Sequence, residues 1–310
     1  MNRQRPSLTR REMLALSSAA VAGLPLRASW AAPGAGGEAF RIVFYTDVHA
    51  RVEWETPRAL AMAAAAINDH RPELIVAGGD LITDGFQSSA ETVAPRWQAY
   101  LEMHRALRPR VEPVLGNHDL VAAIPEDGSP PSADPRGEFR RAFGLERTYR
   151  SIAAGSYRLL ILDAVSVVGG DEKYHGRIEP EQLRWLEREL TSIERSTPIV
   201  LATHLPLLTG FYQATEGATA AAPANRVVVN NREVLELFDG HNLLLVLQGH
   251  LHVAEMLRWR GTTFITGGAL CGKWWRGAWH GTGEGFGVLT LRPDRVDWEY
   301  HGYGWKAVRP

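Results

Sequence analysis

Five apolar runs along the chain are each followed at once by side chains that bind metal ions or exchange protons. The runs reach Tyr45, Val76, Val114, Leu201 and Val246, and their β-branched and aliphatic residues favour β-strands. In an open α/β sheet the carboxyl ends of the strands gather at one edge, and binding sites form there. We therefore expect the polar residues behind the five runs to lie close together in space. Few folds bring five strand ends to one place, so this expectation restricts the possible folds.

The polar residues behind these runs have a spacing that suits a shared site. They are Asp47, His49, Asp80, Asn117, His118, Asp119, His204, His250 and His252. In an extended segment, residues two positions apart point to the same side, so Asp47 and His49 address one point. His250 and His252 share this spacing. Glycine directly precedes three of the nine residues, where it allows tight turns and a close approach of the backbone to an ion or a phosphate.

The chemistry of these side chains indicates metal ions. Histidine nitrogens with a few carboxylate oxygens and one amide oxygen suit borderline first-row divalent ions better than Ca²⁺ or Mg²⁺. The seven residues expected to be ligands are Asp47, His49, Asp80, Asn117, His204, His250 and His252. Seven ligands are too many for one tetrahedral ion, but they fit two ions about 3.5 to 4 Å apart that share a carboxylate. The expected cofactor is therefore a pair of divalent ions, drawn from Mn, Fe, Zn and Co. Taken singly, most of these residues would be interpreted as turn caps or core histidines; their joint occurrence favours the metal site.

The rest of the chain alternates between strand-like and helix-like patterns, which predicts a layered α/β fold. Strands are expected over residues 41–45, 74–77, 111–115, 157–162, 199–201 and 243–247, and helices over 57–68, 97–107, 180–193 and 233–238. After residue 250, strand-like runs over 253–259, 262–265, 286–291 and 296–300 follow one another without helices. These runs predict an antiparallel meander. Residues 122–137 and 206–224 lack a regular pattern and are expected to be loops or lids.

The first residues have the order of an export signal: a basic part, an apolar part and a run of small residues. Arg10 and Arg11 precede the apolar stretch 15–24, and small residues surround Trp30. We expect a twin-arginine-type signal over residues 1–31, a linker over 32–38 and one domain over 39–305, with a Sec-type signal or a membrane anchor as the alternatives. The apolar stretch is too short for an ordinary spanning helix, so the expected mature protein is periplasmic and has no membrane span.

Composition narrows the classes of partner. The chain has 310 residues, of which 45% are hydrophobic and 22% are charged, enough for one sizeable core. Its formal net charge is −1 and it has no long run of Lys or Arg, so no nucleic-acid polymer is expected as a partner. Cys271 is the only cysteine, which rules out an internal disulfide. The sequence specifies no oligomeric state.

The ordered blocks of polar residues resemble those of the calcineurin-like metallophosphoesterases. The blocks are Asp47-X-His49, Gly79-Asp80, Gly116-Asn117-His118-Asp119, His204 and Gly249-His250-X-His252. The resemblance covers residues 40–303, and five ordered blocks at expected strand ends are far more specific than a single histidine pair. It implies a layered α/β sandwich of two mixed β-sheets flanked by helices, and a hydrolase that acts on a small phosphoester.

The resemblance also implies a role for each residue of these blocks. One ion would be held by Asp47, His49, Asp80 and His252, and a second by Asp80, Asn117, His204 and His250, with Asp80 as the bridge. His118 would contact the substrate phosphate or protonate the leaving oxygen, and Asp119 would orient its ring. The purple acid phosphatase branch has a Tyr ligand three residues after the bridging Asp, whereas this chain has Thr83. A purple Fe(III) phenolate centre is therefore not expected.

The expected reaction is hydrolysis of a phosphoester by a hydroxide that bridges the two ions. Two cations lower the pKa of a shared water, hold phosphoryl oxygens and stabilise the charge of an in-line displacement. Segment 79–84 looks more like the bacterial cyclic-nucleotide and glycerophosphodiester hydrolases than the monoesterases, which favours a phosphodiesterase. The alternatives are a phosphomonoesterase, a nucleotide-sugar or lipid pyrophosphate hydrolase, and a non-catalytic metal-binding scaffold. The filled ligand positions and the presence of His118 argue against the scaffold.

A segment rich in glycine and tryptophan is the expected rim of the substrate site. Trp274 and Trp275 stand between a lysine and an arginine, so rings that stack on a base, sugar or lipid head lie next to charges that attract phosphate. The alternative is a Trp pair that plugs the edge of a sheet. The residues expected to contact substrate are Asn117, His175, Trp274, Trp275, Arg276 and His280.

Overall fold

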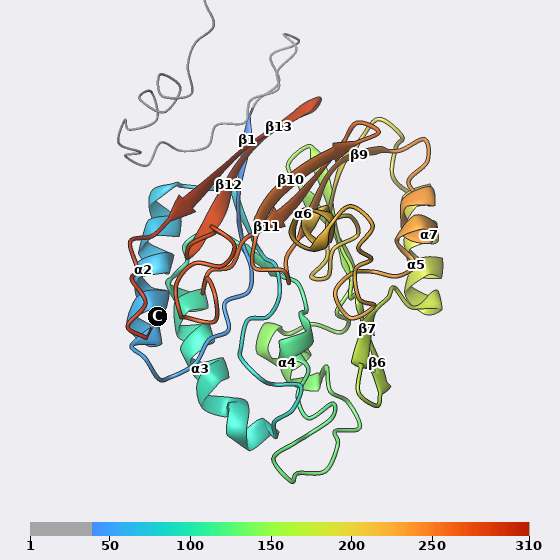
Figure 1. Cartoon of the computed structure of the whole chain (residues 1–310). Helices are drawn as coiled ribbons and strands as arrows, with labels where there is room; N and C mark the ends of the chain where they lie inside the picture. The colour runs from blue at the N-terminus through green and yellow to red at the C-terminus, as the bar shows by residue number, and fades with distance from the viewer. Residues whose placement is uncertain (1–38, 310) are drawn as a thin grey trace, which may run out of the picture.

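The computed structural model describes residues 39–309 (Figure 1). The expected export signal and linker, residues 1–31 and 32–38, lie outside this part of the chain. Within residues 39–309, no helix combines the length and the apolar character that crossing a membrane requires. This part of the chain folds around two large β-sheets that pack against each other, with helices on the outside.

The first sheet has five strands in the order β13-β12-β1-β2-β3. Their bounds are β1 Phe40–Tyr45, β2 Leu74–Ala77, β3 Val111–Pro113, β12 Gly285–Arg292 and β13 Arg295–Gly302. β2 pairs in parallel with β1 and with β3, whereas β12 pairs antiparallel with β1. Every residue of β2 is buried, because a central strand is covered on both faces and its apolar residues run without alternation.

The second sheet has six strands in the order β10-β11-β9-β8-β5-β4. Their bounds are β4 Arg150–Ala154, β5 Tyr157–Ile161, β8 Pro198–Ala202, β9 Asn242–Gln248, β10 Ala254–Trp259 and β11 Thr262–Gly267. The four inner strands run parallel, and the edge strands β4 and β10 are antiparallel to their neighbours. A separate hairpin pairs β6 Val165–Gly169 with β7 Lys173–Gly176. The two large mixed sheets confirm the fold class that the sequence predicts.

Alternate residues of β1 pack into different layers of the core. Ile42 and Phe44 pack between the two sheets, whereas Val43 and Tyr45 pack toward the helices, where the hydroxyl of Tyr45 lies 2.9 Å from that of Tyr100. Helices α2 Thr56–Asp69 and α3 Ala90–Ala106 cover the first sheet, and α5 Pro180–Thr191 and α7 Asn231–Glu236 cover the second (Figure 1). The shorter helices are η1 Asn117–Asp119, α4 Gly137–Phe143 and α6 Phe211–Glu216.

Local capping explains two differences from the expected helices. α3 begins at Ala90 rather than at residue 97, because the Ser89 side chain accepts a hydrogen bond from the N–H of Thr92 and Glu91 lies in the first turn. α6 lies inside segment 206–224, which was expected to be a loop. Glycines at both ends confine this helix to six residues, too few for a periodic apolar pattern to appear.

The strands after residue 250 do not form the expected meander. β10 and β11 form a hairpin in the second sheet, whereas β12 and β13 form a hairpin in the first. Both pairs are antiparallel strands with short connections, and such a run of strands in the sequence does not show whether they join one sheet or two. Segment 268–284 therefore crosses from one sheet to the other, and the N–H groups of Leu270 and Cys271 donate to the carbonyls of Thr46 and Asp47 at the end of β1.

Candidate metal centre

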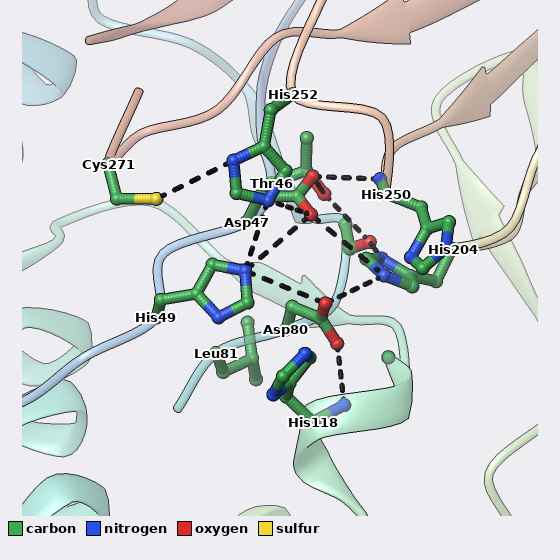
Figure 2. Close-up of polar contacts among 12 residues, drawn as sticks. Thr46, Asp47, His49, Asp80, Leu81, His118, His204, His250, His252 and Cys271 are labelled. Carbon is green, nitrogen blue, oxygen red and sulfur yellow. Dashed lines mark hydrogen bonds and ion pairs between the residues drawn. The ribbon is translucent and has the colours of Figure 1, made fainter. Parts of the chain in front are cut away.

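The polar residues behind the five predicted strands lie together at one edge of the two sheets (Figure 2). Asp47 and His49 follow β1, Asp80 follows β2, Asn117 and His118 follow β3 in η1, His204 follows β8, and His250 and His252 follow β9. All of them are buried except His118, which is partly exposed. Both sheets therefore bring their strand ends to the same place, as the sequence pattern indicates.

The carboxylate of Asp80 lies at the centre of this group. Its Oδ1 accepts a hydrogen bond from the backbone N–H of His118 at 2.7 Å. Its Oδ2 lies 3.1 Å from Nε2 of His204 and 3.6 Å from Nε2 of His49. Two clusters with ligand geometry share Asp80, one with His49 and His118 and the other with His204 and His250. One carboxylate thus faces both halves of the site.

Hydrogen bonds to one oxygen of Asp47 fix the orientation of its carboxylate, and its other oxygen faces the imidazoles. Its Oδ2 accepts hydrogen bonds from the hydroxyl of Thr46 at 2.8 Å and from the N–H of His250 at 2.9 Å. Its Oδ1 lies 3.2 Å from Nε2 of His252 and 3.9 Å from Nε2 of His49. This second oxygen receives no hydrogen bond from residues 39–309, so it is available to a cation.

Backbone carbonyls fix which nitrogen of each ring carries a proton. A carbonyl oxygen only accepts, so Nδ1 of His204 donates to Gly78 at 2.8 Å, and Nδ1 of His252 donates to a loop carbonyl at 2.6 Å. Nε2 of His250 donates to the carbonyl of Asn225 at 3.1 Å. In the neutral rings the opposite nitrogens therefore carry lone pairs. Metal-binding histidines are commonly oriented in this way by the groups behind them.

Buried atoms without partners gather at this point. Within residues 39–309, four buried atoms form no hydrogen bond: Asp47 Oδ1, Asn117 Oδ1, His204 Nε2 and His250 Nδ1. Two of them, Asp47 Oδ1 and His204 Nε2, lie only within ion-pair distance of His252 and Asp80. Leaving such atoms unpaired in the interior costs free energy, so their accumulation in one place requires a physical reason. All four are ligand atoms of the types, oxygen and imidazole nitrogen, that first-row divalent ions bind. The residues therefore fit a pair of divalent cations.

A protonated imidazole balances the negative charge of the two buried carboxylates of the site. Burial raises the pKa of Asp47, but the imidazoles of His252 and His204 outweigh it and bring this pKa to about 2. Burial lowers the pKa of His204, but Asp80 and Asp47 outweigh it and raise this pKa to about 9. Ionised carboxylates thus lie next to a protonated His204. A divalent ion would displace that proton, which couples metal binding to proton release.

Five residues of the group have a backbone conformation that non-glycine residues rarely adopt. Their φ angles are 52° at Asp47, 44° at His49, 52° at Asp80, 71° at His250 and 57° at His252. Each such angle costs on the order of 1 to 3 kcal/mol, so the surrounding structure must hold it in place. Strain of this kind concentrates at binding sites, because it fixes side chains where they are needed.

Gly116 lets the backbone before η1 pass directly against Asp80. A Cβ at this position would lie 2.1 Å from the backbone nitrogen of Asp80 and 2.2 Å from its Oδ1. The carboxylate of Asp119 holds the two segments at this separation, because its Oδ2 accepts from the N–H of Gly116 at 2.8 Å and its Oδ1 accepts from the N–H of Leu81 at 2.7 Å. Glycine is therefore required here for steric reasons.

We expect Gly116→Ala to displace Asp80, to lower the metal content of the purified protein and to reduce the free energy of unfolding by about 2 kcal/mol, because the added methyl group has no room. Elemental analysis and thermal unfolding measure both effects. Gly283→Ala is the matched control, since a Cβ at Gly283 meets no atom within 4 Å. Equal metal content in the two variants would contradict this account of Gly116.

His118 lies at the edge of the group and keeps one side open. Its side chain is 17% exposed, and its ring is edge-on to that of His49 with centroids 4.8 Å apart. Its Nδ1 accepts a hydrogen bond from the backbone N–H of Asp84 at 3.1 Å. The neutral ring therefore carries its proton on Nε2. The carboxylate of Asp84 also approaches Nδ1, at 3.8 Å.

Asp119 does not orient the His118 ring, so that expectation was wrong. Its Oδ1 accepts hydrogen bonds from the N–H groups of Leu81 at 2.7 Å and Ile82 at 3.2 Å, and its Oδ2 accepts from Gly116. Asp119 thus ties the loop after β2 to the loop after β3. Neighbouring residues in a single 3-10 turn point in different directions, and the sequence order alone does not show which way each one points.

Trp274 covers the outer side of the site. Its ring centroid lies 3.9 Å from that of His49, 5.0 Å from that of His118 and 5.3 Å from that of His252. The Trp274 side chain is 38% exposed. A cavity of about 610 Å³ opens beside it, and its lining includes Trp274, His280 and the two histidines that follow β9. The cavity is large enough to receive a sizeable substituent of a molecule bound at the site.

Four of the six expected substrate-contact residues do not line this cavity: Asn117, which lies among the proposed metal ligands, and His175, Trp275 and Arg276. Trp275 is only 2% exposed, and its Nε1 donates to the carbonyl of His49 at 2.9 Å. The guanidinium of Arg276 lies over the ring of Trp54. His175 lies in β7 and pairs with Glu172 in the turn of the β6–β7 hairpin. Adjacent residues of the turn point in opposite directions, so Trp274 faces the site while Trp275 anchors the turn in the core.

The structure adds residues at the site that the sequence patterns did not indicate. Arg226 lines the cavity, and its Nη1 lies 3.4 Å from Nε2 of His250. The ring of Tyr174 is edge-on to that of His250, with centroids 6.4 Å apart. Sγ of Cys271 lies 3.9 Å from Nδ1 of His252. Arg226 and Tyr174 belong to no motif and reach the site from other parts of the chain, so no sequence signal could have found them. Cys271 lies in the glycine- and tryptophan-rich segment that was expected to form the rim.

Comparison with known proteins identifies a family and a relative that matches most of the chain. The family model described as calcineurin-like phosphoesterase matches residues 40–254. The 3′,5′-cyclic adenosine monophosphate phosphodiesterase CpdA of Escherichia coli K12 is 27% identical over 253 residues, which is 77% of this chain and 79% of the relative. The protein of the same name from Escherichia coli O157:H7 matches to the same extent.

Solved structures show a shared fold at low sequence identity. A dimetal phosphatase from Danio rerio is 18% identical with a TM-score of 0.63, and the match covers 85% of this chain and 96% of that chain. The purple acid phosphatase PPD1 from yellow lupin is 16% identical with a TM-score of 0.56, and the match covers 86% of this chain and 52% of that chain. Both likenesses rest on the arrangement of the sheets and helices.

Proposed function

This chain belongs to the calcineurin-like phosphoesterase family, and we propose that it is a phosphodiesterase with a dinuclear metal centre. Membership makes it a metal-dependent hydrolase of phosphoesters. The unpaired ligand atoms gathered around Asp80 carry the dinuclear part of the proposal. Segment 79–84 supports the preference for diesters, as does the relative named a cyclic adenosine monophosphate phosphodiesterase.

In the proposed centre, two ions share Asp80. By the resemblance to the family, one ion would contact Asp47, His49, Asp80 and His252, whose side chains lie within ion-pair distance of one another. The other would contact Asp80, Asn117, His204 and His250, and three of these, Asp80, His204 and His250, form one cluster with ligand geometry. When bound, two ions of the Mn, Fe, Zn or Co type supply Lewis acidity and an acidified water molecule. The side chain of Asn117 contributes an uncharged oxygen, which keeps the site positive toward an anionic substrate.

His118 is placed to assist the oxygen that leaves. Because the N–H of Asp84 occupies Nδ1, the ring presents Nε2–H to the open side of the site. Burial lowers the pKa of His118, which favours the neutral ring with its single N–H donor. Donation from Nε2 to the departing oxygen offsets the negative charge that develops as the P–O bond breaks. Asp84, rather than Asp119, is the positioning residue for this ring.

The cavity beside Trp274 is the proposed place for the substituent of the ester that stays attached to phosphorus. Two of the proposed ligands, His250 and His252, lie in its lining, so a phosphoryl group held at the ions is next to this space. Trp274 and His280 offer ring faces there, and aromatic faces bind bases and sugars by stacking.

We expect Trp274→Ala to raise KM about tenfold for a bulky diester, thymidine 5′-(4-nitrophenyl phosphate), because one stacking partner is lost. Methyl 4-nitrophenyl phosphate has the same leaving group and only a methyl substituent, so its KM should change little. Steady-state assays of released 4-nitrophenolate compare the two esters directly. Trp259→Ala is the control, because Trp259 is 48% exposed and lies outside the cavity. Equal effects of Trp274→Ala on both esters would end the stacking proposal.

A substrate panel tests the proposed function as a whole. Phosphodiesters, phosphomonoesters and pyrophosphates are assayed on protein whose bound metals have been quantified. The proposal expects a diester to have the highest kcat/KM. A monoester or pyrophosphate preference would correct the substrate class, and protein that holds two ions but hydrolyses none of the panel would contradict catalysis altogether.

We further propose that residues 39–305 form the catalytic domain and that residues 1–31 direct export by the twin-arginine route to the periplasm. The support lies in the order of Arg10-Arg11, the apolar stretch and the small residues that follow. N-terminal sequencing of protein from a periplasmic extract should show a first residue near position 32. Full-length protein found only in the cytoplasm would contradict export.

A further inference from the structure

The loop before α7 brings a cation to the edge of the metal centre. Arg226 precedes His250 by 24 residues in the chain, yet its Nη1 lies 3.4 Å from Nε2 of that histidine. Its side chain is exposed and lines the cavity of about 610 Å³ that opens beside Trp274. The guanidinium is therefore accessible to a ligand in the cavity and adjacent to a proposed metal ligand.

The contact between Arg226 and His250 gives the N–H donors of the guanidinium no hydrogen-bond acceptor. Nε2 of His250 donates to the carbonyl of Asn225 at 3.1 Å, so both Nε2 and the arginine Nη1 carry protons in this arrangement. Two donors cannot form a hydrogen bond with each other. Across residues 39–309, no carboxylate forms an ion pair with Arg226. Its N–H groups are thus left for an acceptor that lies at the mouth of the site.

The backbone that carries Arg226 is held on both sides. The N–H of Gly176 donates to the carbonyl of Ala224 at 2.8 Å, and the N–H of Val229 donates to the carbonyl of Gly176 at 2.7 Å. The N–H of Arg226 itself donates to Pro223 at 2.9 Å. These bonds fix the start of the side chain against the end of β7, so the guanidinium reaches the cavity from a defined position.

We propose that Arg226 binds an oxygen of the substrate phosphoryl group on the side of the centre that contains His250. This inference rests on the proposed phosphoesterase function. A guanidinium presents parallel N–H donors that match two phosphoryl oxygens, and such charge-assisted hydrogen bonds are among the stronger ones in proteins. The same donors stabilise the charge that spreads over the phosphoryl oxygens during in-line displacement. The ligand class is therefore any tetrahedral phosphoryl anion, including inorganic phosphate.

Inorganic phosphate is the probe for this inference, because its binding does not require turnover. In the metal-loaded protein, we expect Arg226→Ala to weaken phosphate binding about 30-fold by calorimetry and to lower kcat/KM for a diester by a similar factor. Arg226→Lys keeps the charge but not the paired donors, so it should recover part of both losses. Metal content, measured by elemental analysis, should be the same in all three proteins.

Arg232→Ala is the matched control, because Arg232 is an exposed arginine on α7 that pairs with Glu236 outside the cavity. It should bind phosphate as the unaltered protein does. Phosphate affinity within twofold of the unaltered value in Arg226→Ala would overturn the inference. Loss of metal from Arg226→Ala would also overturn it, since Arg226 would then act by supporting His250. If no ester is hydrolysed at all, the proposed function fails while the calorimetric result still decides the role of Arg226.

Discussion

Asp80→Ala is expected to release both metal ions and to lower kcat/KM on the order of 10³-fold or more. The reason is geometric: Oδ2 of Asp80 lies 3.1 Å from His204 and 3.6 Å from His49, so both halves of the centre depend on one oxygen. Its Oδ1 also holds the N–H of His118 at 2.7 Å, so the alanine variant frees the loop after β3 as well. Elemental analysis and turnover, measured on the same samples, check the two losses together.

A further variant separates the negative charge of Asp80 from its hydrogen bond to the loop after β3, and a second variant is the control. Asp80→Asn keeps an oxygen for the N–H of His118 but removes the negative charge that Asp80 contributes, so it should bind metal more weakly while its loop stays in place. Asp239→Ala is the matched control, because Asp239 is an exposed carboxylate after α7, and it should keep both ions and the full rate. An Asp80→Ala protein that retains two ions per chain would show that Asp80 does not bridge.

His118→Ala is expected to keep both ions and to lose about 10²- to 10³-fold in kcat for esters with a poor leaving group. His118 contributes its backbone N–H, rather than its ring, to Asp80, so alanine leaves the hydrogen bond to Oδ1 intact. What alanine removes is the Nε2–H that the N–H of Asp84 orients. Metal content together with kcat for an alkyl ester is the measurement that checks this separation.

Comparison of leaving groups sharpens the test of His118. A 4-nitrophenolate leaves without protonation, so an aryl ester should lose much less rate in His118→Ala than an alkyl ester of the same phosphoryl group. An equal loss for both esters would assign His118 to phosphate binding instead of leaving-group assistance. Loss of metal in this variant would contradict the distinction between His118 and the ligand residues.

The arrangement of the strand ends could be predicted from the sequence, because its cause is local. A buried strand such as β2 has no polar residue until it ends, so the change from Val76 and Ala77 to Asp80 marks both the end of the strand and the edge of the sheet. Parallel strands then bring such ends to one edge. Repetition of this pattern along the chain carries the family resemblance, and the resemblance in turn implies the two mixed sheets.

Features that depend on tertiary packing could not be predicted in this way. The hairpins β10–β11 and β12–β13 are both antiparallel pairs, and only the strands they pair with place them in different sheets. Trp274 and Trp275 are neighbours of the same type, yet one covers His49 and the other is buried beneath it, because the local turn sets their directions. Arg226 reaches the site through a loop with no motif, and the backbone bonds of Gly176 determine where that loop lies.

The account as a whole depends on two cations that share one carboxylate. A crystal structure of the metal-loaded protein, with the ions located by anomalous scattering, measures this directly. The account predicts two ions per chain about 3.5 to 4 Å apart, both in contact with the carboxylate of Asp80. A single ion, or ions that bind away from Asp80, would contradict it.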